Sequence, residues 1–448
     1  MKISEGFARH KRCLQMQKNE QKKILIVNYA PVILARYELR LAEMFARGGY
    51  ETTVLHFGRM CGYKDSEVLL EVGNVKIYDF SYFKTRSLCH VLKTLKPNIV
   101  VTYASIYLFE RIVYDACKIL KIKCVCIAHG TMNSDFFKIR ENDNSTMTKL
   151  KALPKYFRWL VLWGTVLKEQ SSLFYFKSDF VKLIIDMMLK GKKVFRRGFC
   201  MDTAFVFSQV SKEEFIKNFG YPESKVKVVG NIYFDILKSS KESELNVDKN
   251  IIVLDKTVPT ILYIAQPFVD DSMFGWNEFC EKKFYKSMVN ELRGKYNILF
   301  KLHDRMDAIR IKNYFETGKE KINIFQSEPL DLLFSISNIV IGHNSTAIDF
   351  AFKYKIPIVL MPVSKDNEIN DMYYNHYSRT GWVVKKACFG ELDKVLKEVL
   401  NINCHEVYKL KKEMVENVIG PLDCRAGERI IACMNEMLSC EKVIAELI

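Results

Sequence analysis

The chain has 448 residues, of which 49% are apolar and 27% charged, and a formal net charge of +16 at pH 7. This length predicts about two to three domains with sizeable cores, and the ordinary charged content excludes a globally disordered chain. The excess of Lys and Arg favours an anionic partner, namely a phosphorylated substrate or an anionic membrane face. Nucleic acid fits less well, because the sequence has no zinc-finger spacing, RRM signature or arginine-rich tail.

Cysteine usage and the N-terminal segment indicate the compartment. The 13 cysteines are odd in number and scattered, which is typical of a reducing cytoplasm rather than of a secreted disulfide framework. Residues 1–21 form a basic extension without the apolar core of a signal peptide. No run approaches ~20 uninterrupted apolar residues, so we expect no transmembrane helix. The sequence therefore predicts a cytoplasmic protein.

Residues 22–235 alternate between short apolar runs and amphipathic segments, which predicts an α/β domain built from βαβ units. A strand is expected over Ile24–Tyr29, a helix over Tyr37–Arg47 and a strand over Thr52–His56. The same rhythm returns later in this region, with expected elements at Ile99–Tyr103, Tyr107–Leu120, Cys124–Ala128, Thr203–Ser208, Lys212–Phe219 and Val226–Asn231.

An insertion at residues 149–197 interrupts this first domain and mixes aromatic, basic and aliphatic residues. Two of the four tryptophans, Trp159 and Trp163, lie in it. One interpretation is a patch on an anionic membrane surface, with aromatic side chains at the headgroup level and lysines against anionic lipid. The other is a helical subdomain that packs on its own core. We expect the membrane patch, because it would suit a lipid-linked acceptor.

A polar linker, residues 236–257, precedes a second α/β domain at 258–400, and helices are expected over 401–448. Two doubly wound domains joined in this way predict a cleft, with ligands at the carboxyl ends of the strands. The expected strands and helices of the second domain are Thr260–Ala265, Trp276–Leu292, Asn297–Leu302, Ala308–Thr317, Ile322–Phe325, Pro329–Ile336, Ile339–Gly342, Thr346–Tyr354 and Ile356–Met361.

Two strand ends of the second domain carry side chains suited to phosphate. Lys301, His303 and Arg305 follow one strand, where they could meet phosphate oxygens or form a solvated turn. The tetrad His343, Asn344, Ser345 and Thr346 separates a buried strand from a helix. Its hydroxyls and free N–H groups predict an anion site, although Ser345 could serve as a helix cap alone.

Two further residues are weaker candidates in this domain. Gln266 closes the first strand and could contact a base or a phosphate. Asp349 lies one turn into the helix and could bind a ribose hydroxyl. A position without a ligand explains each of them equally well.

The segments Lys301–Arg305, His343–Phe352 and Lys355–Val359 resemble the donor half of GT-B glycosyltransferases that build bacterial surface polymers. That group includes capsule enzymes and polysialyltransferases, teichoic-acid (CDP-glycerol) glycerophosphotransferases and the related UDP-GlcNAc 2-epimerases. The resemblance spans roughly residues 200–385 at the level of pattern. It implies that His303 and Ser345–Thr346 bind the nucleotide phosphates, in place of a His-Pro and a Ser-Ser/Thr motif. Asp304 departs from the motif by replacing the proline.

An inverting transferase also needs a base for the acceptor hydroxyl. His129 ends a first-domain strand in His129-Gly130-Thr131, and similar His-Gly pairs occur in the teichoic-acid and capsule enzymes; Asp135 and Glu38 are reserve candidates. The absence of an Asp-x-Asp triplet favours a mechanism without a metal or other cofactor. Walker and Gly-x-Gly-x-x-Gly motifs are also absent, which disfavours an NTPase or a dinucleotide enzyme.

The sequence therefore predicts a GT-B fold with two Rossmann-like domains and a helical insertion in the first. The expected function is a metal-independent, inverting glycosyltransferase. It would carry sugar from a nucleotide-sugar donor to a cell-surface glycan or lipid-linked acceptor, at the inner face of the cell membrane. Alternatives are a CDP-glycerol-type polyol-phosphate transferase, a UDP-GlcNAc 2-epimerase-like isomerase, and a non-catalytic assembly partner.

Overall fold

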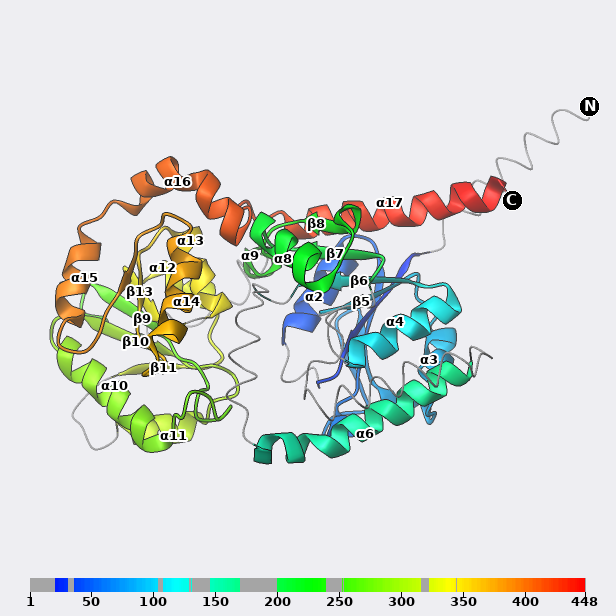
Figure 1. The fold of residues 1–448 in the computed structure, drawn as a ribbon, viewed down its shortest axis with the longest axis horizontal. Coiled ribbons are helices and arrows are strands. Elements are labelled where there is room, and N and C mark those ends of the chain that lie inside the picture. Colours follow the sequence, from blue (N-terminus) through cyan, green and yellow to red (C-terminus); the bar gives the residue numbers. More distant parts are fainter. Residues whose placement is uncertain are drawn as a thin grey trace, which may run out of the picture. The chain divides into compact units, whose positions relative to one another are not determined.

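The computed structural model describes residues 21–30, 36–103, 108–128, 130, 146–169, 200–238, 252, 254–315, 322–343 and 345–447. Its strands form two largely parallel sheets with helices between successive strands (Figure 1). The chain also divides into two compact units: Met1–Cys126 with Lys155–Ile184 and Ile431–Ile448, and Ile127–Pro154 with Ile185–Ile430. The domain boundaries expected from the sequence stay a prediction.

The first sheet has the strand order β3-β4-β2-β1-β5-β6-β7-β8. Strand β1 pairs in parallel with both β2 and β5, so the winding direction reverses between β1 and β5. Among the described strand pairs of this sheet, only β3 and β4 run antiparallel. The strands are β1 (Lys23–Asn28), β2 (Glu51–His56), β3 (Leu69–Val72), β4 (Val75–Asp79), β5 (Ile99–Thr102), β6 (Lys123–Ile127), β7 (Thr203–Val206) and β8 (Val226–Val228).

The second sheet has the order β11-β10-β9-β12-β13-β14, and its winding reverses between β9 and β12. In open α/β sheets, ligands bind beside such a reversal, outside the carboxyl ends of the strands. The strands are β9 (Thr260–Ile264), β10 (Asn297–Lys301), β11 (Asn323–Phe325), β12 (Ile339–Gly342), β13 (Ile358–Leu360) and β14 (Val384–Lys386).

The helices follow the amphipathic segments and begin at polar caps, such as Ser208, Asp307 and Asn403, whose side chains accept from backbone N–H groups. The α-helices are α2 (Arg36–Arg47), α3 (Leu88–Leu95), α4 (Leu108–Leu120), α6 (Thr146–Lys168), α8 (Gln209–Phe219), α9 (Ile232–Lys238), α10 (Glu278–Leu292), α11 (Ala308–Asn313), α12 (Leu330–Ser335), α13 (Phe350–Tyr354), α14 (Asn367–Ser378), α15 (Leu392–Leu400), α16 (Cys404–Ile419) and α17 (Ala426–Leu447); short 3-10 turns are η3 (Arg59–Cys61), η4 (Phe80–Phe83), η5 (Glu223–Lys225) and η7 (Thr346–Asp349).

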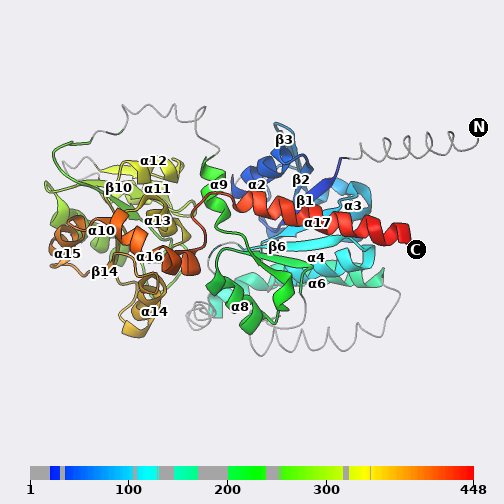
Figure 2. The ribbon, with the colours of Figure 1, turned by 90° about the horizontal axis from the view of Figure 1, so that it is seen from above.

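The strands are buried because apolar residues occupy both faces, as expected for parallel sheets covered on two sides. Every residue of β5, β7, β9, β12 and β13 is buried. The middle of α17, which belongs to the first compact unit, lies beside α2 and β1 (Figure 2). There Asn435 accepts from the Tyr50 hydroxyl at 2.8 Å and from the Lys22 ammonium at 3.0 Å.

Helix α6 covers the start of the predicted insertion, and residues 170–197 of the insertion lie outside the described ranges. Trp159 packs against Phe109 with ring centroids 4.9 Å apart, and the Trp163 indole N–H donates to Asp115 at 2.8 Å. Both tryptophans are 2% exposed and belong to the core of the first unit, so they do not supply the expected aromatic membrane contact. Among the described side chains of α6, the large apolar ones that are exposed are Phe157, at 68%, and Val161, at 45%.

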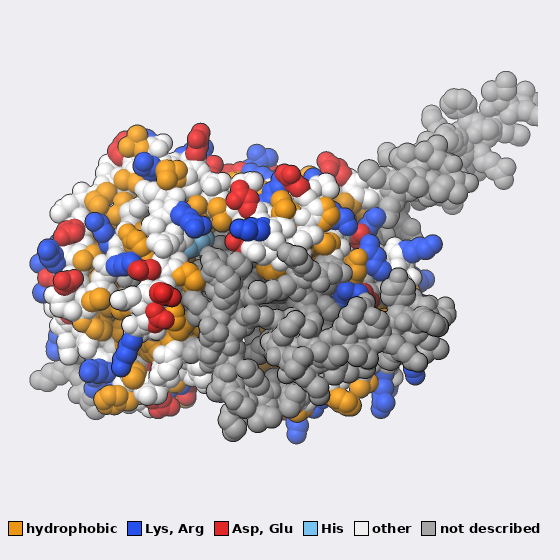
Figure 3. Space-filling view, in the orientation of Figure 1, with side chains coloured by type: hydrophobic (Ala, Val, Ile, Leu, Met, Phe, Trp, Pro, Cys, Tyr) orange, Lys and Arg blue, Asp and Glu red, His pale blue; other side chains and the backbone are white. Residues whose placement is uncertain are grey.

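Within the described ranges, no helix is both long and apolar enough to cross a bilayer. On the face drawn in Figure 3, the described basic side chains are interspersed with acidic ones.

Candidate functional site

The carboxyl edge of the second sheet brings together three of the segments predicted to bind the donor. Gln266 follows β9, Lys301 to Arg305 end β10, and His343 to Thr346 follow β12. The Ala265 N–H donates to the Lys301 carbonyl at 2.9 Å, and β9 lies between β10 and β12. These segments therefore meet where the winding of the sheet reverses.

The turn after β12 is held by its own backbone. Ser345 has an extended backbone, and its Oγ accepts from the Ala347 N–H at 3.2 Å. The Ser345 carbonyl accepts from the Ile348 N–H at 2.9 Å and from the Tyr377 hydroxyl at 3.0 Å. Asn344 lies outside the described residues. The predicted single helix is instead the 3-10 turn η7 followed by the short α13, so any anion site here rests on hydroxyl and N–H groups of the turn.

Gly130, the middle residue of the predicted His129-Gly130-Thr131 motif, lies beside this turn. It belongs to the same compact unit as β12 and has a φ of +104°. A Cβ at this position would stand 2.9 Å from the Thr346 Oγ1, so a side chain here would be both strained and crowded. The backbone next to His129 therefore lies against Thr346. His129 itself and Asp135 lie outside the described residues.

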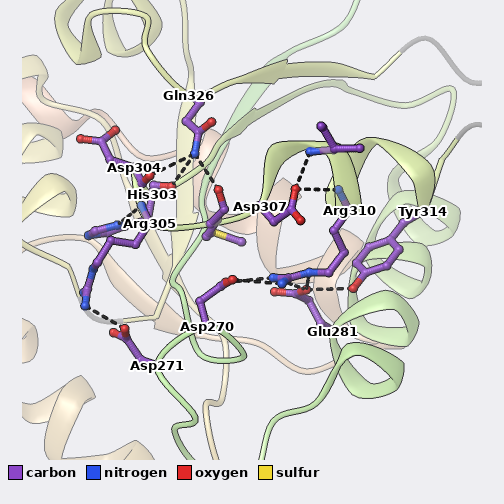
Figure 4. A network of polar contacts seen from close by, with 12 residues as sticks. Asp270, Asp271, Glu281, His303, Asp304, Arg305, Asp307, Arg310, Tyr314 and Gln326 are labelled. Atoms are coloured by element: carbon purple, nitrogen blue, oxygen red, sulfur yellow. Dashed lines mark hydrogen bonds and ion pairs between the residues drawn. The ribbon is translucent and has the colours of Figure 1, made fainter. Parts of the chain in front are cut away.

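The loop after β10 presents a neutral imidazole (Figure 4). The Arg305 N–H donates to the His303 Nδ1 at 3.2 Å, which leaves the ring proton on Nε2. Burial, reinforced by the Arg305 charge, lowers the His303 pKa to about 4. The Gln326 amide donates to the carbonyls of His303 at 3.1 Å and Met306 at 2.8 Å and fixes the turn. His303 is thus a positioned, uncharged N–H donor at neutral pH.

The two cations of this loop have different roles. The Lys301 ammonium donates to the backbone carbonyls of Gln326 and Leu302, so it stabilises the ends of β10 and β11. The Arg305 side chain is 52% exposed and pairs with Asp271 at 2.7 Å. Arg305 is therefore the cation of the two that a ligand can reach.

A second Arg–Asp pair, which sequence reasoning missed, joins the loop after β9 to helix α11 (Figure 4). Arg310 binds both carboxylate oxygens of Asp270, at 3.0 and 2.8 Å, and also contacts Glu281 at 3.2 Å. The Tyr314 hydroxyl donates to Glu281 at 3.0 Å. The adjacent aspartates at 270 and 271 were the only available signal. Gln266 is half-buried, and its amide donates to the Ala265 carbonyl at 3.2 Å.

His343 is a core residue, which corrects its predicted phosphate role. It is 1% exposed, and burial lowers its pKa to about 4. With the neutral ring, Nδ1–H donates to the Met361 carbonyl at 2.9 Å and Nε2 accepts from the Tyr263 hydroxyl at 2.9 Å. Aromatic rings surround it, and both nitrogens are used within the protein.

Asp349 is also buried, at 1% exposed, and does not face a ligand as predicted for ribose binding. Burial raises its pKa to about 8, so the side chain is mostly a neutral acid at pH 7. The Tyr377 hydroxyl of α14 is close enough to influence its ionisation.

Glu38 is the one described candidate for the base. It lies in the first turn of α2, is 4% exposed, and its Oε1 accepts from the Asn28 amide at the end of β1. Its Oε2 has no hydrogen-bond partner in the described structure. Burial raises the Glu38 pKa to about 7, in the range useful for proton transfer. Within the described ranges, no group of three or more His, Cys, Asp or Glu could hold a metal ion.

The fold is shared with solved structures of low sequence identity. The UDP-GlcNAc 2-epimerase of Methanocaldococcus jannaschii, in complex with UDP-GlcNAc and UDP, has a TM-score of 0.52 and 13% identity, covering 93% of this chain and 100% of that one. The calicheamicin glycosyltransferase CalG4 gives 0.51 and 12%, covering 94% and 99%. The wall teichoic acid polymerase TagF with CDPG gives 0.52 and 14%, covering 94% and 90%.

No family model matches the sequence, and no curated protein matches it. At 12–14% identity, the structural likeness establishes the architecture alone. The chain has the GT-B fold, as its sequence predicts.

Proposed function

We propose that this protein is a metal-independent, inverting glycosyltransferase that transfers a sugar from a nucleotide-sugar donor to a growing cell-surface glycan or lipid-linked acceptor. The observation that carries the proposal is the approach of Gly130 to the Thr346 hydroxyl. Gly130 directly follows the predicted base, His129, in the sequence, so its contact with Thr346 supports the proposal that the base acts near the phosphate turn. A base and an anion site next to each other are what transfer from a phosphate leaving group requires.

Donor binding is assigned to the carboxyl edge of the second sheet. The Ser345 and Thr346 hydroxyls and the His303 Nε2–H supply neutral donors, and Arg305 supplies the positive charge. Fixed donors of this kind stabilise the diphosphate as its charge grows in the transition state. The epimerase that was solved with UDP-GlcNAc and UDP supports a nucleotide-sugar donor on this fold.

In the proposed reaction, His129 accepts the proton of an acceptor hydroxyl. The acceptor oxygen forms a bond to the anomeric carbon of the donor sugar, while the bond from that carbon to the phosphate oxygen breaks. The nucleotide leaves with the bonding electron pair and is stabilised by the phosphate turn. Asp135 and Glu38 are the reserve bases.

A cytoplasmic location at the inner face of the membrane remains part of the proposal. Its support is the exposed apolar pair Phe157 and Val161 on α6, together with the basic net charge. Phe157→Ser with Val161→Ser tests it and leaves the core residues Trp159 and Trp163 in place. A membrane patch requires that the wild type bind anionic liposomes and that the variant bind them less.

A polyol-phosphate transferase of the CDP-glycerol type is the second candidate. The His129-Gly130 pair, which resembles that group, favours it. The same donor edge would then hold the nucleotide, but the bond that breaks would be a phosphate–oxygen bond instead of the bond to a sugar carbon. Analysis of the transferred group by mass spectrometry separates the two reactions.

The test of the donor site is titration calorimetry with UDP, CDP, CMP and GDP on the wild type and on the Ser345→Ala, Thr346→Ala double variant. We expect one nucleotide to bind the wild type, and the double variant to bind it about tenfold or more weakly, since two charge-facing donors are lost. The control is Thr94→Ala with Ser439→Ala, because those hydroxyls bond to helix carbonyls on an exposed surface. Equal affinity of a folded double variant and the wild type would refute the phosphate assignment.

A further inference from the structure

Asp349 is a buried acid at the end of the 3-10 turn η7, which begins at Thr346 of the proposed donor turn. Neither carboxyl oxygen of Asp349 makes a geometrically sound hydrogen bond in the described structure. The side chain is nevertheless 1% exposed, and an unsatisfied buried carboxylate is costly. The Tyr377 hydroxyl is close enough to influence its ionisation, but donates its own proton to the Ser345 carbonyl at 3.0 Å.

The protonation state of Asp349 resolves this conflict. A neutral carboxylic acid has an O–H group, which can donate to the phenol oxygen of Tyr377 while the phenol proton stays on Ser345. A carboxylate has only acceptors, so it would compete with the Ser345 carbonyl for that same proton. The neutral acid therefore completes the chain of bonds, and the carboxylate breaks it.

We propose that Asp349 is a positioning residue that, as a neutral acid, holds the Ser345–Thr346 turn through Tyr377 and releases it on ionisation at alkaline pH. The inference rests on the proposed function only in assigning the donor phosphate to this turn. It also gives Asp349 a role within the protein in place of the predicted contact with ribose.

The titratable groups next to Asp349 do not change their charge between pH 7 and 9, so Asp349 is the group expected to ionise in that range. Among the described residues, the titratable side chain facing it is Tyr377 of α14, whose pKa burial raises well above 10. The adjacent His376 is held neutral, because burial lowers its pKa to about 4. Burial raises the Asp349 pKa to about 8, so ionisation is expected between pH 7 and 9.

The first experiment follows the turn without any donor. Hydrogen exchange of peptides covering residues 340–353 is measured from pH 6.5 to 9 and corrected for intrinsic base catalysis. We expect the corrected exchange of the wild type to rise about tenfold per pH unit above pH 8, once the protonated fraction falls in proportion. Asp349→Asn should show no such rise, because the amide can still donate to Tyr377. In Tyr377→Phe the same peptides should exchange faster at every pH, because the turn loses the Tyr377 hydroxyl while Asp349 itself is unchanged.

The matched control is Asp331→Asn, on α12. Asp331 also accepts from a tyrosine, Tyr354, but it pairs with the Lys353 ammonium at 2.9 Å. Its variant should keep the pH dependence of the wild-type turn. An identical alkaline rise in the wild type and in Asp349→Asn would overturn the proposal.

The second experiment measures UDP affinity over the same pH range, with the nucleotide that binds best replacing UDP if the calorimetric survey finds another. The wild type should lose affinity about tenfold per pH unit above pH 8, whereas Asp349→Asn should stay level. The failure modes are distinct. If nucleotide binding is insensitive to Ser345→Ala with Thr346→Ala, the proposed function fails, while hydrogen exchange still decides the role of Asp349.

Discussion

Each sheet places a buried acid near the carboxyl end of a central strand, but the two acids are held differently. Glu38, beside β1, accepts from Asn28 of that same strand. Asp349, beyond β12, makes no sound hydrogen bond in the described structure, and its neighbour Tyr377 of α14 donates to the Ser345 carbonyl instead. Burial raises the pKa of both, to about 7 for Glu38 and about 8 for Asp349.

The two sheet edges differ in which polar groups remain available to bind a ligand. At the first edge, polar side chains bond to each other, so the Asn28 amide is occupied. At the second edge, the turn is fixed through the Ser345 carbonyl. The Ser345 hydroxyl proton stays available to an anion, because the Ser345 Oγ only accepts a hydrogen bond, from the Ala347 N–H. Rigid backbone with open side chains is the arrangement expected of a preorganised binding site.

The largest expected effect is on the transfer rate. It should depend on His129, whereas nucleotide affinity should depend on the donor edge of the second sheet. We predict that His129→Ala lowers the transfer rate by about 10²- to 10⁴-fold, the usual range for loss of a general base. Nucleotide affinity should stay within about twofold, since the donor groups remain. Nucleotide release and calorimetry measure the two quantities on the same preparation.

His405→Ala is the control for this variant, because that histidine is exposed on α16. Normal turnover by His129→Ala would clear His129 of the base role and move attention to Glu38. A rate profile that rises with pH through 7 would then be expected, from the raised Glu38 pKa.

The next effect is on stability, and it compares the two buried acids directly. Each folded state keeps a proton that the unfolded chain releases, so wild-type stability should fall as pH rises. The window is pH 4.5 to 7 for Glu38 and 3.8 to 8 for Asp349. One pKa unit corresponds to about 1.4 kcal/mol. We therefore predict that Glu38→Gln removes about 3 kcal/mol of this loss and that Asp349→Asn removes more, measured by urea unfolding from pH 4 to 9.

Asp393 supplies a control of opposite sign. Its ion pair with Lys295 lowers its pKa to about 2, so its stabilisation is present above pH 3.8 and disappears as pH falls through 2. Asp393→Asn should therefore show no gain at alkaline pH. If Glu38→Gln and Asp349→Asn also fail to flatten the profile, the two acids are not protonated in the folded protein at neutral pH.

The fold was largely predictable because its signals are local. Continuous apolar runs such as Ile339–Gly342 mark strands buried on both faces, and that run coincides with β12. Sequence periodicity identifies no element in the interval 57–98, although it holds β3, β4 and α3. Strand β3 lies at the edge of the sheet and is only partly buried, with Leu69 exposed. Short, half-exposed edge strands leave little periodicity to read.

The site was less predictable, because the environment of a strand-end residue comes from distant parts of the chain. His303 and His343 both follow apolar strands, yet only His303 remains near the surface. The partners of His343, Tyr263 and Met361, lie 80 and 18 residues away. Asp349 likewise meets Tyr377 from α14. A strand end predicts the edge of the sheet on which a residue lies, but not the side to which its side chain turns.

A smaller effect tests whether His343 belongs to the core. We predict that His343→Gln lowers the free energy of unfolding by about 2 kcal/mol, because one of two buried hydrogen bonds loses its geometry. Nucleotide affinity should change by less than about twofold, since the side chain does not face the turn. Denaturant unfolding and calorimetry on the same sample measure both. A large loss of affinity with normal stability would restore the phosphate role that the sequence predicted for His343.

The smallest effect on stability is expected at Arg305, whose pair with Asp271 is half exposed. Exposed pairs contribute roughly 0–1 kcal/mol, so Arg305→Ala should barely change unfolding. Its loss of nucleotide affinity should be several-fold and should shrink with added salt, because the guanidinium acts by charge. Asp271→Asn sharpens the test, since releasing Arg305 from its partner should strengthen nucleotide binding. Arg310→Ala should instead lower stability clearly and change nucleotide affinity little, because Arg310 is bound by Asp270 and the buried Glu281. Equal affinities in Arg305→Ala and Asp271→Asn would mean that the donor edge binds phosphate through neutral groups alone.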